Sequence, residues 1–282
     1  MKVQKSNLDN TSTLYLVPTP IGNFDDMTFR SVDVLKNVDI IYCEDTRVTK
    51  VLLSHFNINT PLKSYHIFNE NSRCDEVLNN LKNGLNVALV SDAGLPCISD
   101  PGFLISKYVI ENDYNVVSLP GASASLTALI ASGLPNEKFY FNGFLNSKQS
   151  QRIKQLQQLV DKEETLIIYE APHRIEETLK DIYQVFGNRN IVIARELTKK
   201  YEEYIRGSLE EIIQNVKDLK GEIVLIVEGC SMKSNIIELN KLSIKEHFDY
   251  YMNSGMTEND AMKSVAKDRN VSKNVIYKEI KC

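Results

Sequence analysis

The chain has 282 residues, of which 43% are hydrophobic and 25% charged, and its formal net charge is −4. This composition is typical of a globular protein with a sizeable core, and the length fits two domains of about 100–150 residues each. The longest apolar runs are far shorter than the roughly 18 residues of a membrane span. The polar first residues argue against a secretory signal. The five cysteines are far apart in the sequence, so we expect reduced thiols, a cytoplasmic location and no metal site.

The first half of the chain alternates between short apolar runs and amphipathic stretches. The apolar runs predict strands at residues 14–17, 38–43, 62–68, 86–90 and 116–119. Helices fit between them, and Thr28 is a good N-cap for the first. Continuous apolar strands that alternate with helices indicate a parallel sheet covered on both faces. We therefore predict an α/β fold, with a first domain at residues 1–134.

A linker-like segment at residues 133–138 precedes a second α/β unit. Its strands are expected at residues 139–144, 165–169, 191–195, 204–207 and 222–227. The strand at residues 204–207 is short and partly polar, which is typical of an edge strand. We expect a mixed sheet in this second domain, which we place at residues 135–231.

The last segment, residues 232–282, has a different pattern. Thr257 followed by Asp260 resembles a capping box, and Asn270 stands at a turn between two short amphipathic helices. From residue 261 onwards the chain has six basic and two acidic residues, which gives this segment a net charge of +4. We predict a helix-turn-helix-like tail whose basic side chains either contact nucleic-acid phosphates or form a solvated helix face.

Loops rich in glycine, proline and small polar residues follow four strands of the first domain. They span residues 18–23, 44–47, 91–102 and 120–125. Ligands of open parallel sheets bind beyond the carboxyl ends of the strands, so these loops are the candidate site. Asp92 is suited to a ribose hydroxyl or an ammonium group, although an Asx turn is an equal alternative. Phosphate-loop, dinucleotide-binding and nucleophile-elbow motifs are absent from the sequence.

Seven segments carry a resemblance to a known family. They read LVPTPIGNFDDMTFR, EDTR, SDAGLPCISDPG, LPGASA, YEAPHRI, ARELTKKYEE and GEIVLIVEG. Together they resemble the tetrapyrrole-methylase superfamily, and within it the ribosomal RNA methyltransferases, over essentially the whole chain. The resemblance implies two α/β domains with S-adenosyl-L-methionine in the cleft between them. It also implies methyl transfer to the 2′-hydroxyl of a cytidine in 16S rRNA, at the decoding centre, by a homodimer that needs no metal.

The resemblance also implies which residues contact the cofactor. They are Ile21, Gly22, Asp92, Gly94, Leu95, Ser123 and Ala124 in the first domain, and Tyr169, Glu170 and Ala171 in the second. Most of these contacts involve the backbone, so the side chains at these positions constrain them only weakly.

The predicted chemistry needs more than a cofactor site, because a ribose hydroxyl is a poor nucleophile and must lose its proton. Glu44, Asp45 and Glu70 follow the second and third predicted strands, and Arg47 is close by. We hypothesise that Asp45 is the base, with Glu44 and Glu70 as the other candidates. Arg47 would orient the base or hold a phosphate. A purely structural salt bridge between Asp45 and Arg47 is the alternative interpretation.

Two other functions compete with RNA methylation. A methyltransferase of a tetrapyrrole or another small molecule would share the fold and cofactor, but should lack the basic tail and the acidic cluster at residues 44–47. A non-catalytic regulator would bind nucleic acid through the tail and would leave the four loops unexplained. The partner that we expect is 16S rRNA or the small ribosomal subunit.

Overall fold

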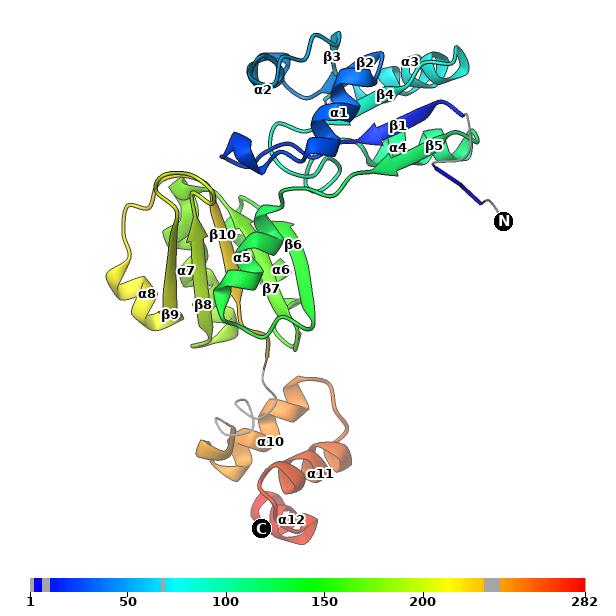
Figure 1. Cartoon of the computed structure of the whole chain (residues 1–282). Coiled ribbons are helices and arrows are strands. Elements are labelled where there is room, and N and C mark those ends of the chain that lie inside the picture. The colour runs from blue at the N-terminus through cyan, green and yellow to red at the C-terminus, as the bar shows by residue number, and fades with distance from the viewer. Residues whose placement is uncertain (1–2, 7–10, 67–68, 231–238, 282) are drawn as a thin grey trace.

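The computed structural model describes residues 3–6, 11–66, 69–230 and 239–281. Two α/β domains follow one another, and three short helices form a separate tail (Figure 1). In that part of the chain, no helix combines the length and apolar character needed to cross a membrane. The predicted boundary between the second domain and the tail, at residues 231–232, lies outside the described residues.

The first sheet is entirely parallel, as predicted, with the strand order β3-β2-β4-β1-β5. Its strands are β1 (Thr13–Leu16), β2 (Ile40–Cys43), β3 (Leu62–Ser64), β4 (Val87–Val90) and β5 (Asn115–Ser118). Helices α1 (Phe29–Asn37) and α2 (Thr46–His55) pack on one face, and α3 (Glu70–Lys82) and α4 (Phe103–Glu111) on the other. The central strand β4 is buried along its whole length because both faces are covered.

The third strand is shorter than predicted, and a helix begins soon after it. β3 ends at Ser64, and the last two residues of the predicted strand, 67–68, lie outside the described residues. The side chain of Asn69 accepts a hydrogen bond from the His66 backbone N–H at 2.8 Å, which turns the chain into α3. Glu70 is therefore the first residue of a helix rather than the end of a strand.

The second sheet is mixed, as predicted, with the order β6-β7-β10-β8-β9. Its strands are β6 (Phe139–Phe144), β7 (Thr165–Glu170), β8 (Asn190–Arg195), β9 (Glu203–Ser208) and β10 (Ile223–Val227). β6 and β7 are parallel, and the other neighbours are antiparallel. Helices α6 (Gln149–Gln157), α7 (Ile175–Phe186) and α8 (Leu209–Asn215) pack on one face of the sheet.

The opposite face of the second sheet is covered by α5 (Ala124–Ser132), which the sequence analysis had placed in the first domain. Ala128 and Leu129 are buried against β7, β8 and β10, and Figure 1 shows α5 lying on that sheet. The chain therefore crosses between the domains before residue 124 and not at residue 134. An apolar helix packs wherever a complementary face is free, and its own periodicity does not identify the sheet.

The tail consists of α10 (Ile244–Asn253), α11 (Glu258–Asp268) and α12 (Lys273–Lys281), which share a small core of their own. Thr257 caps α11 through its side chain, as predicted. Asn270 has a φ of 51°, the left-handed conformation expected for the turn between α11 and α12.

Candidate functional site

The loop after β1 and the loop after β4 are joined by two backbone hydrogen bonds. The Thr19 N–H donates to the Gly94 carbonyl at 2.9 Å, and the Gly94 N–H donates back at 3.0 Å. Gly94 has a φ of 82°, which an L side chain rarely adopts, so glycine suits this close approach. These two hydrogen bonds hold both loops at the carboxyl edge of the first sheet, where ligands of parallel sheets bind.

A cavity of about 430 Å³ lies beside these two loops, between the two domains. Loops after β1, β4 and β5 form its first wall. The ends of β6 and β7, the start of β10 and Leu197 form the second. The volume is within the range of cavities that hold small organic ligands.

The cavity brings together most of the residues that the resemblance assigned to the cofactor. Those that line it are Ile21, Asp92, Gly94, Leu95, Ser123, Ala124, Tyr169, Glu170 and Ala171. Gly22 is not among the lining residues. A Cβ atom at this position would stand 2.5 Å from Cγ of Lys199, so Gly22 allows the loop after β1 to approach the second domain.

Two aromatic rings, Phe144 and Tyr169, line the second wall of the cavity, and Phe141 packs against Tyr169. Tyr169 makes edge-on contacts with Phe141 and Phe144, with ring centroids 5.1 and 5.5 Å apart. Phe144 lines the cavity, and 55% of its surface is exposed. Phe144 is not among the site residues predicted from the sequence, although its place at the end of a predicted strand was a usable signal.

The Glu170 carboxylate is buried and fully engaged in holding the turn after β7. It accepts hydrogen bonds from the Ala171 N–H at 2.7 Å and the Thr178 hydroxyl at 2.6 Å, and it pairs with Arg174. These contacts hold the backbone of the turn in place at the cavity wall, and Arg174 balances the charge of Glu170.

Asp45 and Arg47 form a pair at the start of α2. The Asp45 carboxylate caps the helix by accepting from the Arg47 N–H at 2.8 Å, and the Arg47 guanidinium donates to it at 2.6 Å. The side-chain hydrogen bonds from Arg47 lower the pKa of Asp45 to about 2. Because a strongly acidic carboxylate accepts a proton poorly, this geometry argues against Asp45 as the base. The structural salt bridge that the sequence analysis left open is present.

Glu70 lies behind the loop after β4 and not in the cavity. Its buried Oε1 accepts hydrogen bonds from the Tyr65 hydroxyl at 2.8 Å and from the Gly102 N–H at 3.0 Å. The expectation that Glu70 faces the reacting groups is corrected by this placement. A helix that begins at Glu70 points the side chain at the loop, which it supports.

Three further carboxylates, Glu44, Asp92 and Asp100, lie close together at the carboxyl edge of the first sheet. Burial and the nearby Asp92 raise the pKa of Glu44, and burial, Glu44 and Asp92 raise that of Asp100 to about 6. Asp92 and Asp100 line the cavity. Asp100 belongs to a loop predicted to form the site but was not itself predicted as a site residue, because the burial that alters its pKa is a property of the folded chain. Among the described residues, no cluster of His, Cys, Asp and Glu suited to a metal ion is found.

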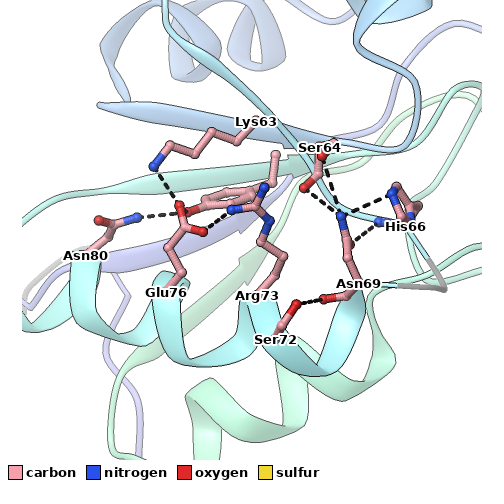
Figure 2. A network of polar contacts seen from close by, with 9 residues as sticks. Lys63, Ser64, His66, Asn69, Ser72, Arg73, Glu76 and Asn80 are labelled. Atoms are coloured by element: carbon pink, nitrogen blue, oxygen red, sulfur yellow. Dashed lines mark hydrogen bonds and ion pairs between the residues drawn. The ribbon is translucent and has the colours of Figure 1, made fainter.

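A network of polar side chains joins β3 to α3 behind this wall (Figure 2). Lys63 donates to Glu76 at 2.6 Å, and the Asn69 side chain contacts His66 Nε2 at 3.1 Å in addition to its backbone. His66 is close enough to Glu44 to oppose the rise in pKa that burial causes there. The network therefore fixes the strand end beside the acidic residues.

The chain is similar to several known proteins. Residues 13–213 match the family model described as Tetrapyrrole (Corrin/Porphyrin) Methylases. Ribosomal RNA small subunit methyltransferase I of Bacillus subtilis is 50% identical over 94% of this chain and 92% of its own length. The protein of the same name from Halalkalibacterium halodurans is 47% identical over 98% of each chain.

A solved structure of uroporphyrin-III C-methyl transferase from Thermus thermophilus, complexed with S-adenyl homocysteine, shares the fold. Its TM-score is 0.53 at 17% identity, and the alignment covers 77% of this chain and 97% of that one. Since the family model covers the first α/β domain and most of the second, and the relatives match nearly end to end, this chain belongs to the tetrapyrrole methylase family.

Proposed function

We propose that this protein transfers the methyl group of S-adenosyl-L-methionine to the 2′-hydroxyl of a cytidine in 16S rRNA, at the decoding centre of the small ribosomal subunit. The observation that carries the proposal is the cavity between the domains, because the expected cofactor positions converge on it. The names of the near-full-length relatives support the choice of ribosomal RNA as substrate. When bound, the cofactor supplies an activated methyl group, so the protein has to align the hydroxyl and exclude water.

The lining of the cavity fits this cofactor. Leu95 and Leu197 offer apolar surface, and Phe144 with Tyr169 offers aromatic surface for a planar adenine. Asp92 exposes its carboxylate on the first wall, where it would attract the ammonium group or accept from a ribose hydroxyl. We assign these five residues to the cofactor on that basis.

We assign the pair at the start of α2 to the RNA. The Arg47 side chain is 89% exposed, and Asp45 holds its guanidinium in one orientation. An oriented guanidinium is well suited to a phosphate, which it contacts through two parallel N–H groups. In this proposal Asp45 and Arg47 position the substrate, and the proton is taken by another group.

The tail is proposed as a second RNA contact. It lies at the end of the second domain remote from the first, away from the cavity (Figure 1). Part of its positive charge is neutralised, since Lys263 pairs with Asp260 and Lys281 pairs with an acidic residue of α11. Lys278 and the exposed ring of Tyr277 on α12 are suited to a nucleic acid.

We further propose that the protein acts as a homodimer in the cytoplasm, where its substrate is assembled. Large apolar side chains on the two domains support association: Phe29 is 96% exposed, Ile130 73% and Phe103 68%. Sedimentation equilibrium would test this, and a mass equal to one chain at micromolar concentration would refute the dimer.

The function is tested by mass spectrometry of 16S rRNA from cells with and without this gene product. We expect one 2′-O-methylcytidine at the decoding centre to disappear on deletion and to return when the purified protein methylates the isolated subunits. An unchanged rRNA would refute the proposal. Loss of tetrapyrrole methylation instead would favour the small-molecule alternative.

The role of the tail is tested with Lys278→Ala and Tyr277→Ala. Both should weaken binding to the small subunit and leave cofactor affinity unchanged. Only Lys278→Ala should reduce the salt dependence of binding, because only it removes a phosphate contact. RNA affinity that is insensitive to both substitutions would show that the basic face of α12 is merely solvated.

A further inference from the structure

The cavity wall offers four carboxylates, and three of them accept hydrogen bonds or form ion pairs within the protein. Glu170 accepts several hydrogen bonds, as described above. Glu222 pairs with Lys199 Nζ at 3.1 Å, and Asp92 accepts from the Asp45 N–H at 3.1 Å. The fourth is Asp100, and none of the described residues donates a hydrogen bond to its carboxylate. Asp100 is therefore available to accept a proton from a ligand.

The loop that carries Asp100 is held in an unusual conformation. Cys97 and Ser99 have φ angles of 71° and 62°, in the left-handed region that residues other than glycine rarely adopt. Such conformations persist where the surrounding structure enforces them, and they concentrate at functional sites. Here the enforcing contact is the hydrogen bond from the Gly102 N–H to the buried Glu70 carboxylate. Asp100 therefore lines the cavity from a loop that Glu70 supports on its other side.

The surroundings of Asp100 suit a proton acceptor at neutral pH. Half-burial raises its pKa, and the carboxylates of Glu44 and Asp92 raise it further, to about 6. The Cys97 thiol on the same loop and Tyr169 across the cavity are the other titratable groups that Asp100 influences. A base with a pKa slightly below the working pH is deprotonated and still has an appreciable affinity for a proton.

We propose that Asp100 is the catalytic base of the methyl transfer, an inference that rests on the function proposed above. The proton of the attacking hydroxyl passes to the Asp100 carboxylate while the 2′-oxygen bonds to the methyl carbon. The bond from that carbon to sulfur breaks, and both of its electrons remain on sulfur. Asp100 then releases the proton to water, which restores the carboxylate.

The test compares the wild-type protein with Asp100→Asn and Asp100→Glu. Asp33→Asn, an exposed change on α1, is the matched control. Single-turnover methylation of small ribosomal subunits is measured from pH 5 to 9, and binding of S-adenosylhomocysteine is measured by calorimetry. In addition, carboxyl carbons of ¹³C-aspartate-labelled protein are titrated by NMR without cofactor, and the Asp100 signal is assigned by its loss in Asp100→Asn.

We expect Asp100→Asn to slow methylation about 100- to 10,000-fold, the usual effect of removing a general base, with binding changed less than about threefold. The wild-type rate should fall about tenfold for each pH unit below about 6, because only the deprotonated carboxylate accepts a proton. Asp100→Glu should recover part of the rate, Asp33→Asn should behave as wild type, and the Asp100 carboxyl signal should titrate near pH 6.

Near-normal rates in Asp100→Asn, or a carboxyl signal that titrates near pH 4, would overturn the assignment of Asp100 and leave the proposed function intact. A wild-type protein that binds S-adenosylhomocysteine but never methylates the subunit would overturn the proposed function, and the assigned step with it. Loss of both binding and rate in Asp100→Asn would show that the residue holds the cofactor instead.

Discussion

The start of α2 and the loop after β4 lie at the same edge of the first sheet, yet they place their carboxylates in opposite surroundings. Asp45 caps a helix and is paired with Arg47, which lowers its pKa to about 2. Asp100 is half-buried, has no cation beside it among the described residues and lies near two other carboxylates, so its pKa rises to about 6. A place at the carboxyl edge of a sheet thus locates a candidate residue, but its immediate partners decide what chemistry it can do.

The largest effect should separate these two carboxylates directly. Asp100→Asn is expected to reduce the single-turnover rate at least about 100-fold. Asp45→Asn should reduce it less than about tenfold, because asparagine is also a good N-cap and the helix remains intact. Rapid-quench measurements with saturating cofactor and RNA would check this. The reverse order of the two effects would return Asp45 to the role of base.

A smaller effect is expected from removing the Glu70 carboxylate, which supports the Asp100 loop. Glu70→Ala leaves two buried donors, the Tyr65 hydroxyl and the Gly102 N–H, without their acceptor. We expect the free energy of unfolding in urea to fall by about 2–4 kcal/mol. Glu70→Gln keeps an acceptor oxygen and should lose less than half as much. Equal losses in the two variants would mean that the charge of Glu70, and not its hydrogen bonds, supports the loop.

The raised pKa of Asp100 also predicts a pH-dependent change in stability. The folded protein holds this proton up to about pH 6, whereas the unfolded chain releases it near 3.8, so stability falls as the pH rises through that interval. At pH 8 Asp100→Asn should therefore be more stable than wild type by about 1–3 kcal/mol, and at pH 4 the two should be nearly equal. Urea unfolding at both pH values measures this, with Asp33→Asn as the control. An equal difference at the two pH values would contradict it.

The smallest effect should come from the exposed partner of Asp45. Arg47→Lys keeps the positive charge but loses the forked contact, so RNA binding should weaken about two- to fivefold at low salt. Filter binding to the small subunit, with Arg30→Lys on α1 as a control, would detect it. A loss of cofactor affinity would show instead that the start of α2 belongs to the cofactor site.

Much of the fold follows from local sequence patterns. The apolar runs at β4 and β10 are long enough for buried strands and too short for helices spanning the core, and both are strands in the structure. Thr28 and Thr257 cap helices where predicted, because capping depends on a few neighbouring residues. The loops that line the cavity could also be predicted, since the ends of parallel strands meet at one edge of a sheet.

The sequence by itself determined the order of strands and helices, the loops at the sheet edge and the turn at Asn270, because each depends on residues close together in the chain. Only the tertiary structure decided that α5 packs on the second sheet, that Glu70 braces Gly102 and that Arg47 neutralises Asp45 while Asp100 has no such partner. The contacts of α5, Glu70 and Asp100 join segments distant in sequence. The Asp45–Arg47 pair is local, but whether its ion pair forms depends on the rotamers and solvent exposure of the folded site.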